Sequence, residues 1–273
     1  MTLNEKIGAA IDHQNSLVCI GLDTDPAKIP EPVRNSPDAV CEFNRIIIDA
    51  TRDLAAAYKP NLAFYEALGR RGWEVLERTI RLIPDNVIKI GDAKRGDIGN
   101  TAAKYAGALF DLGFDAVTVN PYMGWDSIAP FVEAAGKGAF ILCMTSNPSA
   151  AELQNLESGG RPLYQHVAEK ITAWNKHDNC GLVAGATRPE ILQDIRAIAP
   201  DLPFLIPGIG AQGGDLEKTV AYGTDAQGGM ALINSSRGIL YASAGKDFAG
   251  AARGKALELR DAINRYRALK KKE

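Results

Sequence analysis

Short runs of apolar residues alternate with longer amphipathic segments along the whole chain. The short runs are typical of buried strands, and the longer segments have the apolar spacing of helices. The runs predict eight strands, at Leu17–Asp23, Tyr58–Phe64, Asn86–Asp92, Ala116–Val119, Ala139–Met144, Gly181–Ala184, Phe204–Ile206 and Met230–Ile233. The segments between them predict eight helices, at about Ala39–Ala56, Arg70–Leu82, Asn100–Leu112, Ser127–Ala135, Leu163–Lys176, Pro189–Ile198, Leu216–Tyr222 and Phe248–Leu269.

Eight strands, each followed by a helix, predict a closed parallel barrel, the (β/α)8 or TIM-barrel architecture of the α/β class. A six-stranded open sheet would leave two predicted strands without a place. The length of 273 residues suits one such barrel. Because no segment rich in Pro, Gly or Ser divides the chain, we expect a single barrel domain over residues 1–273.

The longest stretch without a predicted element, Thr145–Arg161, follows the fifth strand and contains Gly159-Gly160. Loops of this length are often functional. Two interpretations stay open: a mobile loop over an active site, or a surface loop with no part in catalysis.

Composition narrows the function classes. Hydrophobic residues make up 46% of the chain and charged residues 23%, and the net charge of -2 gives no reason to expect nucleic acid or an anionic membrane as a partner. No apolar run approaches the roughly 20 residues that span a bilayer. Met1–Glu5 predicts a helix capping box rather than a signal sequence.

The cysteines are widely spaced, at Cys19, Cys41, Cys143 and Cys180. We therefore expect reduced thiols and a cytoplasmic protein.

The segment Gly91–Ala102 carries the strongest chemical signal. It follows the apolar run Val87–Ile90, and residues two apart on a strand share a face, so Asp92 and Lys94 are expected to point the same way. Asp97 lies just beyond the strand end. Neighbouring carboxylates favour the ammonium form of a lysine, which can still protonate a strongly basic carbon. The alternative is a surface ion-pair cluster, but charges this close on an apolar strand usually line a site.

Other polar residues follow the strands at the same end. In a TIM barrel the active site lies at the carboxyl ends of the strands, and charges in an otherwise apolar barrel must pair or bind a ligand. The remaining candidates are Asp23 and Asp25 after strand one, Lys59 and Asn61 on strand two, Asn120-Pro121-Tyr122 after strand four and Thr145-Ser146-Asn147-Pro148 after strand five.

Two late loops predict a phosphate site. The glycine-rich segment Pro207–Asp215 follows strand seven, and Asn234–Gly238 follows strand eight. Loops at these places form the usual phosphate pocket of the fold, from backbone N–H groups and a short helix. The guanidinium of Arg237 can add a bidentate contact.

The histidines are not at strand ends. His13, His166 and His177 fall on or beside predicted helices, so neither a histidine general base nor a histidine-rich metal site is indicated. No glycine fingerprint for a dinucleotide opens a βαβ unit. The expected chemistry therefore depends on lysine and aspartate.

Together these motifs resemble orotidine 5'-phosphate decarboxylases, and more narrowly their longer bacterial subfamily. The resemblance rests on Asp92–Thr101, on Pro207–Gly214 with Arg237, and on the segments after strands four and five. It implies loss of CO2 from C6 of orotidine 5'-phosphate to give uridine 5'-phosphate, the last step of de novo pyrimidine synthesis, with no metal ion and no cofactor.

The resemblance also implies a role for each site residue. The catalytic network would consist of Lys59, Asp92, Lys94 and Asp97. In it, Lys94 would protonate C6. The substrate would be bound by Asp23, Ile98, Thr101, Ser146, Pro207, Gln212 and Arg237. Of these, Asp23 would contact ribose together with Lys59, Ser146 the pyrimidine, and Gln212 with Arg237 the phosphate. Asp97, Ile98 and Thr101 would reach into the partner subunit's site, which implies a homodimer with shared active sites. Met144 stands where the family pattern has a basic residue, so the resemblance gives no contact there.

Two alternatives remain. A sugar-phosphate decarboxylase or aldolase of the same superfamily, such as 3-keto-L-gulonate 6-phosphate decarboxylase, would use magnesium bound by carboxylates, to which Asp23 and Asp97 would contribute. The Pro207–Gly214 loop favours the pyrimidine branch. A catalytically silent barrel that senses a phosphorylated ligand is the other alternative, and the presence of both lysines and both aspartates argues against it.

Overall fold

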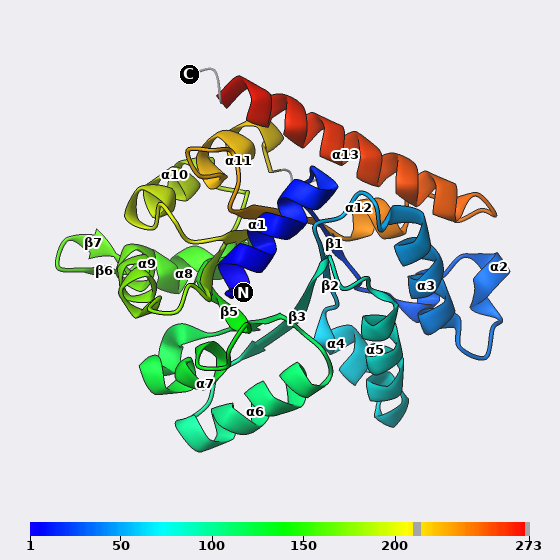
Figure 1. Cartoon of the computed structure of the whole chain (residues 1–273), viewed down its shortest axis with the longest axis horizontal. Helices are drawn as coiled ribbons and strands as arrows, with labels where there is room; N and C mark the ends of the chain where they lie inside the picture. Colours follow the sequence, from blue (N-terminus) through cyan, green and yellow to red (C-terminus); the bar gives the residue numbers. More distant parts are fainter. Residues whose placement is uncertain (210–213, 271–273) are drawn as a thin grey trace.

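Among the residues that the structure describes, 1–209 and 214–270, eight parallel strands close into a barrel with helices around it (Figure 1). The structure is a computed structural model. The barrel strands are β1 (Val18–Gly21), β2 (Ala57–Lys59), β3 (Ile88–Arg95), β4 (Ala116–Val119), β5 (Gly138–Met144), β8 (Cys180–Ala184), β9 (Phe204–Ile206) and β10 (Ala231–Ser235). They follow one another around the barrel in chain order, and β1 pairs with β10 to close it. The predicted TIM barrel is therefore confirmed.

Helices cover the outside of the barrel. The longer ones are α1 (Leu3–Gln14), α3 (Ala39–Thr51), α5 (Arg70–Leu82), α6 (Gly99–Asp111), α9 (Leu163–Trp174), α10 (Pro189–Ile198), α11 (Leu216–Gly223) and α13 (Phe248–Lys270). Short helices are α2 (Glu31–Arg34), α4 (Leu62–Glu66), α7 (Ala129–Val132), α8 (Ala151–Gln154) and α12 (Arg237–Leu240). The predicted helix at Ser127–Ala135 is shorter than expected, because only Ala129–Val132 is α-helical. No described helix has the length and apolar character needed to cross a membrane.

The strands are buried on both faces, which explains why they read as continuous apolar runs. Every residue of β1, β4 and β8 is buried. Side chains that point inward fill the barrel, and those that point outward pack against the helices. All four cysteines are buried and unpaired, as expected.

The second predicted strand, Tyr58–Phe64, is wrong in its second half. β2 ends at Lys59, and α4 begins at Leu62. The side chain of Asn61 accepts a hydrogen bond from the N–H of Ala63 and caps this helix, so the apolar run after Pro60 becomes helical.

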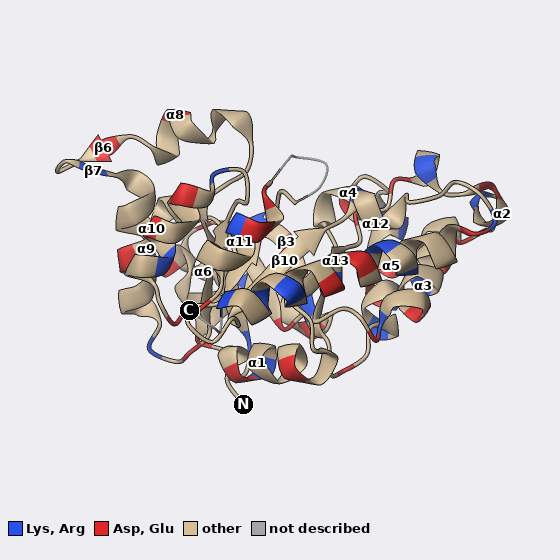
Figure 2. Ribbon diagram, turned by 90° about the horizontal axis from the view of Figure 1, so that it is seen from above, with Lys and Arg blue, Asp and Glu red and all other residues tan. Residues whose placement is uncertain are grey.

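α1 closes the amino-terminal end of the barrel. The predicted capping box is present: the N–H of Glu5 donates to Thr2 Oγ1 at 3.2 Å, and the N–H of Thr2 donates to Glu5 Oε2 at 2.8 Å. Lys6 of this helix forms an ion pair with Asp115, just before β4. Figure 2 shows α1 at one end of the molecule and α8, β6 (Glu157–Ser158) and β7 (Arg161–Pro162) at the other.

Arg196 of α10 is tied to the same amino-terminal end. Its two terminal nitrogens lie 2.6–3.1 Å from the carbonyl oxygens of Ala199, Pro200, Leu202, Gly223 and Met230. Burial lowers the pKa of this guanidinium to about 10, against the opposing charges of Asp225 and Asp201. Because these carbonyls precede β9 and β10, Arg196 fixes the start of two barrel strands.

The stretch Thr145–Arg161 has more structure than expected. It contains a 3-10 turn at Pro148–Ala150, the helix α8 and the small antiparallel hairpin of β6 and β7. The hairpin projects beyond the barrel wall (Figure 2). This segment stands at the carboxyl end of β5, the end at which the candidate site was predicted.

Candidate active site

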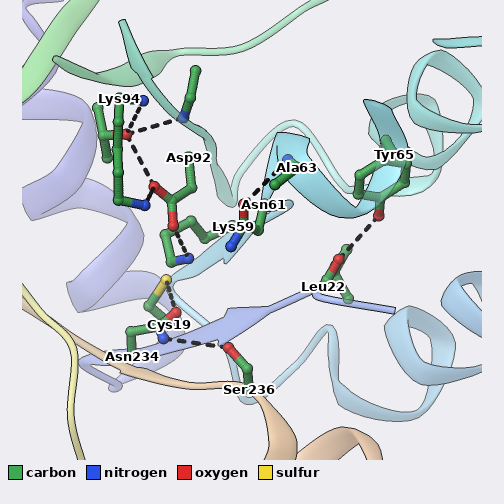
Figure 3. Close-up of polar contacts among 12 residues, drawn as sticks. Cys19, Leu22, Lys59, Asn61, Ala63, Tyr65, Asp92, Lys94, Asn234 and Ser236 are labelled. Carbon is green, nitrogen blue, oxygen red and sulfur yellow. Dashed lines mark hydrogen bonds and ion pairs between the residues drawn. The ribbon is translucent and has the colours of Figure 1, made fainter. Parts of the chain in front are cut away.

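The centre of the site is an array of two lysines around one aspartate. Lys59 Nζ lies 2.7 Å from Asp92 Oδ2, and Lys94 Nζ lies 2.6 Å from Asp92 Oδ1 (Figure 3). Lys59 comes from the end of β2, and the other two residues come from the end of β3. The side chain of Lys59 is 5% exposed and that of Asp92 11%, whereas that of Lys94 is 50% exposed. Lys94 is therefore the most exposed member of the array.

The charges within the array favour the ionised forms of Lys59 and Asp92. Burial disfavours the ammonium form of Lys59, but the charges of Asp92 and Asp23 outweigh it and raise the pKa of this lysine. Burial likewise disfavours the carboxylate of Asp92, but Lys59 and Lys94 outweigh it and lower the pKa of this acid well below its usual range. A carboxylate between two ammonium groups gives the site a fixed field in a partly buried place.

A bulge in β3 brings Asp92 and Lys94 together. Gly91 pairs with Val117 and Arg95 with Val119, so the three residues between them on β3 face Thr118 alone on β4. Lys94 has a φ of +49°, in the left-handed region that costs a residue with a side chain roughly 1–2 kcal/mol. The two side chains thus meet as predicted, but through an irregular backbone rather than through a regular strand.

Two cavities adjoin this array. The first, of about 170 Å³, is lined by Asp23, Lys59, Asp92, Pro207, Gly208, Ile209, Asn234, Ser235, Ser236, Arg237 and Gly238. The second, of about 400 Å³, is lined by Lys59, Asp92, Lys94, Thr118, Leu142, Thr145, Ser146, Asn147, Gln154, Val183, Leu205 and Pro207. They share Lys59, Asp92 and Pro207. Most of the predicted site residues therefore lie around one continuous pair of cavities.

The first cavity has the features of an anion site. The side chain of Ser236 packs against Gly21 of β1, where a Cβ atom would overlap Ser236 Oγ. The side chain of Asn234 donates to Ser236 Oγ at 3.4 Å and accepts from the thiol of the buried Cys19 (Figure 3). Arg237 begins α12 and is exposed, and within the described ranges its guanidinium has no ion-pair partner. Gln212 lies outside the described residues.

Asp23 contributes an unsatisfied acceptor. Its Oδ1 atom is buried and has no hydrogen-bond partner among the described residues. A buried carboxylate oxygen without a partner is costly, so this atom is ready to accept a donor from a ligand, such as a hydroxyl group.

The second cavity combines polar and apolar walls. Ser146 lies against the end of β8, where a Cβ atom on Gly185 would stand 3.0 Å from the Ser146 backbone. Gln154 of α8 accepts from the N–H of Thr145 at 2.8 Å and donates to Thr145 Oγ1 at 2.9 Å, which ties the long fifth loop to the cavity. Met144 is buried and lines neither cavity, so its side chain offers no contact to a ligand in them.

Three predicted residues do not join the array within one chain. The carboxylate of Asp97 accepts from the N–H of Ile98 at 2.8 Å, and among described residues no ion pair links it to Lys94. Ile98 is 54% exposed, and Thr101 follows it on the first turn of α6. All three lie on the rim beside the cavities and line neither of them.

Sequence reasoning missed Thr118 and Gln154. Thr118 is the single polar residue of the strand Ala116–Val119, and a lone hydroxyl in an apolar barrel strand is the signal that would have identified it. Gln154 gave no such signal, because its partner Thr145 is nine residues away across a loop without predicted structure.

Comparison with known proteins agrees with this geometry. Residues 16–252 match the model of the orotidine 5'-phosphate decarboxylase / HUMPS family. A curated relative from Dehalococcoides mccartyi, named orotidine 5'-phosphate decarboxylase, is 52% identical over 272 residues, which cover 98% of this chain and 99% of the relative.

Solved structures show the same likeness. The structure of Leishmania donovani OMP decarboxylase is 40% identical, has a TM-score of 0.86 and covers 98% of this chain and 99% of its own. That of orotidine 5'-monophosphate decarboxylase from Methanocaldococcus jannaschii, complexed with inhibitor BMP, shares the fold at 24% identity, with a TM-score of 0.64 and coverage of 87% and 97%. The chain therefore belongs to the orotidine 5'-phosphate decarboxylase family, and its reaction is the carboxy-lyase step of pyrimidine biosynthesis that converts orotidine 5'-phosphate to uridine 5'-phosphate.

Proposed function

We propose that this decarboxylation runs on Lys59, Asp92, Lys94 and Asp97 without a metal ion or cofactor. The observation that carries the proposal is the Lys59–Asp92–Lys94 array, in which Lys59 and Asp92 line both cavities and Lys94 lines the second. The cavities together are lined by three cationic side chains, Lys59, Lys94 and Arg237, and two carboxylates, Asp23 and Asp92. This excess of positive charge suits a substrate that carries a phosphate and a carboxylate.

Lys94 has the position of the proton donor. When the bond between C6 and the carboxylate breaks, CO2 leaves and the electron pair stays on C6, where no neighbouring carbonyl delocalises it. The Lys94 ammonium stabilises this charge and then transfers one proton to C6, which leaves a neutral amine that solvent reprotonates. Asp92 supports the step because its Oδ1 atom, 2.6 Å from Lys94 Nζ, orients the ammonium group.

The substrate would span both cavities. The phosphate would lie in the first, against Arg237 and the backbone after Pro207, with Gln212 as a further contact, and the pyrimidine would lie in the second, against Ser146. Asp23, with its unpartnered oxygen, and Lys59 would bind the ribose hydroxyls between them. A ribose hydroxyl would supply the hydrogen-bond donor that the buried Oδ1 atom of Asp23 lacks.

Replacing Arg237 with alanine should lower kcat/KM for orotidine 5'-phosphate at least about 100-fold, because a bidentate contact to phosphate contributes about 3 kcal/mol. The effect is measured by the loss of substrate absorbance. Turnover of the nucleoside orotidine, which lacks the phosphate, should not change, and added guanidinium should restore part of the lost activity. Arg265→Ala, which removes an exposed arginine of α13, is the matched control. An unchanged kcat/KM in Arg237→Ala would place the phosphate elsewhere.

Activity should persist after treatment with a chelator, because the proposed mechanism stabilises the C6 charge with Lys94 alone. The test compares kcat/KM of the protein before and after dialysis against EDTA, with and without added Mg²⁺. A loss of activity that Mg²⁺ reverses would instead support the magnesium-dependent chemistry of the sugar-phosphate branch.

We further propose a homodimer of single-domain chains, residues 1–273, with shared active sites in the cytoplasm. Large apolar side chains are exposed around the rim that carries Asp97: Phe64, Ile98, Tyr105, Tyr122, Met123 and Trp125. They belong to α4, to α6 with its N-cap Ile98, and to the segment after β4. Both helices contact β3, and α6 also contacts the turn Trp125–Ser127. Exposed apolar groups gathered on one side favour an interface. The same rim supplies Ile98 and Thr101 to the partner's substrate.

A further inference from the structure

The bulge of β3 depends on one residue of the neighbouring strand. Asp92, Ala93 and Lys94 stand opposite Thr118 alone, so a regular ladder cannot satisfy their backbone groups. Thr118 Oγ1 takes the place of the missing carbonyl oxygen: it accepts from the N–H of Ala93 at 3.0 Å and from the N–H of Lys94 at 2.9 Å.

The same hydroxyl also holds the carboxylate of the array. Thr118 Oγ1 donates to Asp92 Oδ1 at 3.0 Å, and this oxygen is the one that accepts from Lys94 Nζ at 2.6 Å. A hydroxyl has one hydrogen to donate and two lone pairs to accept with, so these three bonds use its full capacity. One buried side chain, 2% exposed, therefore fixes both the backbone and the ion-pair partner of Lys94.

We propose that Thr118 is a positioning residue for proton transfer, which acts through Asp92 and Lys94; the proposal rests on the role of Lys94 proposed above. Lys94 occupies the left-handed region, at a φ of +49°, which only strong local bonds maintain in a residue with a side chain. Without the Thr118 hydroxyl, the bulge loses the acceptor for two N–H groups, and the Asp92 carboxylate loses a hydrogen-bond donor. The position of Lys94 Nζ in the cavity is then no longer fixed.

The expected signature is a change in kcat rather than in KM. Thr118 has no capacity left for a hydrogen bond to the substrate, whereas the placement of a reacting group affects the barrier strongly. A residue that served folding alone would change stability and leave kcat per folded molecule unaltered.

The test compares Thr118→Val, which keeps the branched shape but removes the hydroxyl, with Thr118→Ser, which keeps the hydroxyl. Thr118→Val should lower kcat roughly 10- to 100-fold, the effect of losing one bond to a charged group, with KM and uridine 5'-phosphate affinity nearly unchanged. Thr118→Ser should restore most of the wild-type kcat.

Thr51→Val is the matched control. Thr51 is also fully buried, and its hydroxyl bonds to the Ile47 carbonyl oxygen and to the hydroxyl of Tyr58, away from the cavities. We expect Thr51→Val to lower the melting temperature and leave kcat unchanged. If Thr118→Val does not fold, Thr118→Ala replaces it in the same comparison.

A wild-type kcat in the variant without the hydroxyl, an equal loss in Thr118→Ser, or a rise in KM at constant kcat would each overturn the inference. Lys94→Ala separates this failure from a failure of the proposed mechanism. An inactive Lys94→Ala beside a fully active Thr118→Val would refute the role of Thr118 alone, whereas an active Lys94→Ala would refute the role of Lys94 itself.

Discussion

Lys94→Ala loses decarboxylation while the protein still binds uridine 5'-phosphate. We expect kcat to fall by more than roughly 1,000-fold, because the substitution removes both the charge that stabilises the C6 carbanion and the proton that C6 receives. Nucleotide binding should persist because the first cavity, proposed above for the phosphate, is lined by other residues, such as Arg237. The measurements are single-turnover loss of orotidine 5'-phosphate and a binding titration with uridine 5'-phosphate.

Lys89→Ala is the matched control for this variant. Lys89 lies on the same strand and also forms an ion pair, with Asp85 at 2.9 Å, but it lies outside both cavities. It should keep wild-type turnover. If Lys94→Ala keeps more than a few per cent of the wild-type rate, another group donates the proton.

Mixed dimers should regain activity that neither parent has. If Asp97 serves the partner's site, Lys94→Ala and Asp97→Ala homodimers are both inactive, but a hybrid has one site with both defects and one with none. Random exchange between equal amounts makes about half of the dimers hybrid, each with half of its sites intact, so activity recovers to roughly a quarter of wild type when sites act independently. The assay follows turnover after verified subunit exchange.

A second mixture controls for nonspecific recovery. Lys59 and Lys94 are both bound to Asp92 within one chain. Hybrids of Lys59→Ala with Lys94→Ala therefore carry one defect in each site and should stay inactive. Recovery in this control would show that the regained activity does not come from shared sites, and no recovery in the Asp97 mixture would assign Asp97 to the site of its own chain.

The barrel could be predicted from sequence because its strands are buried on both faces. Each strand then reads as a short apolar run, and the eight runs with their helices lead to one architecture. The error at Tyr58–Phe64 arose where the pattern stays apolar but the backbone turns: the Asn61 cap determines the helix there, and composition does not show it.

The site was predictable to the level of residue types at strand ends, and not to the level of their geometry. Asp92 and Lys94 were expected on one face of a regular strand, whereas a bulge brings them together. That bulge depends on Thr118, 24 residues from Lys94 along the chain. The lone hydroxyl marks Thr118 within its apolar strand, but the sequence does not show which backbone groups this hydroxyl binds. The same holds for Gln154 and Thr145, because Gln154 of α8 bonds to the residue that directly follows β5.

The bonds of Arg196 lie at the end of the barrel opposite the two cavities. This guanidinium ties together the starts of β9 and β10, at the opposite ends of those strands from the cavity residues Pro207 and Ser235. In TIM barrels the amino-terminal face serves stability and the carboxyl-terminal face serves catalysis. Substitutions around Arg196 should therefore change the free energy of unfolding while turnover at the opposite end of the barrel stays largely unaffected.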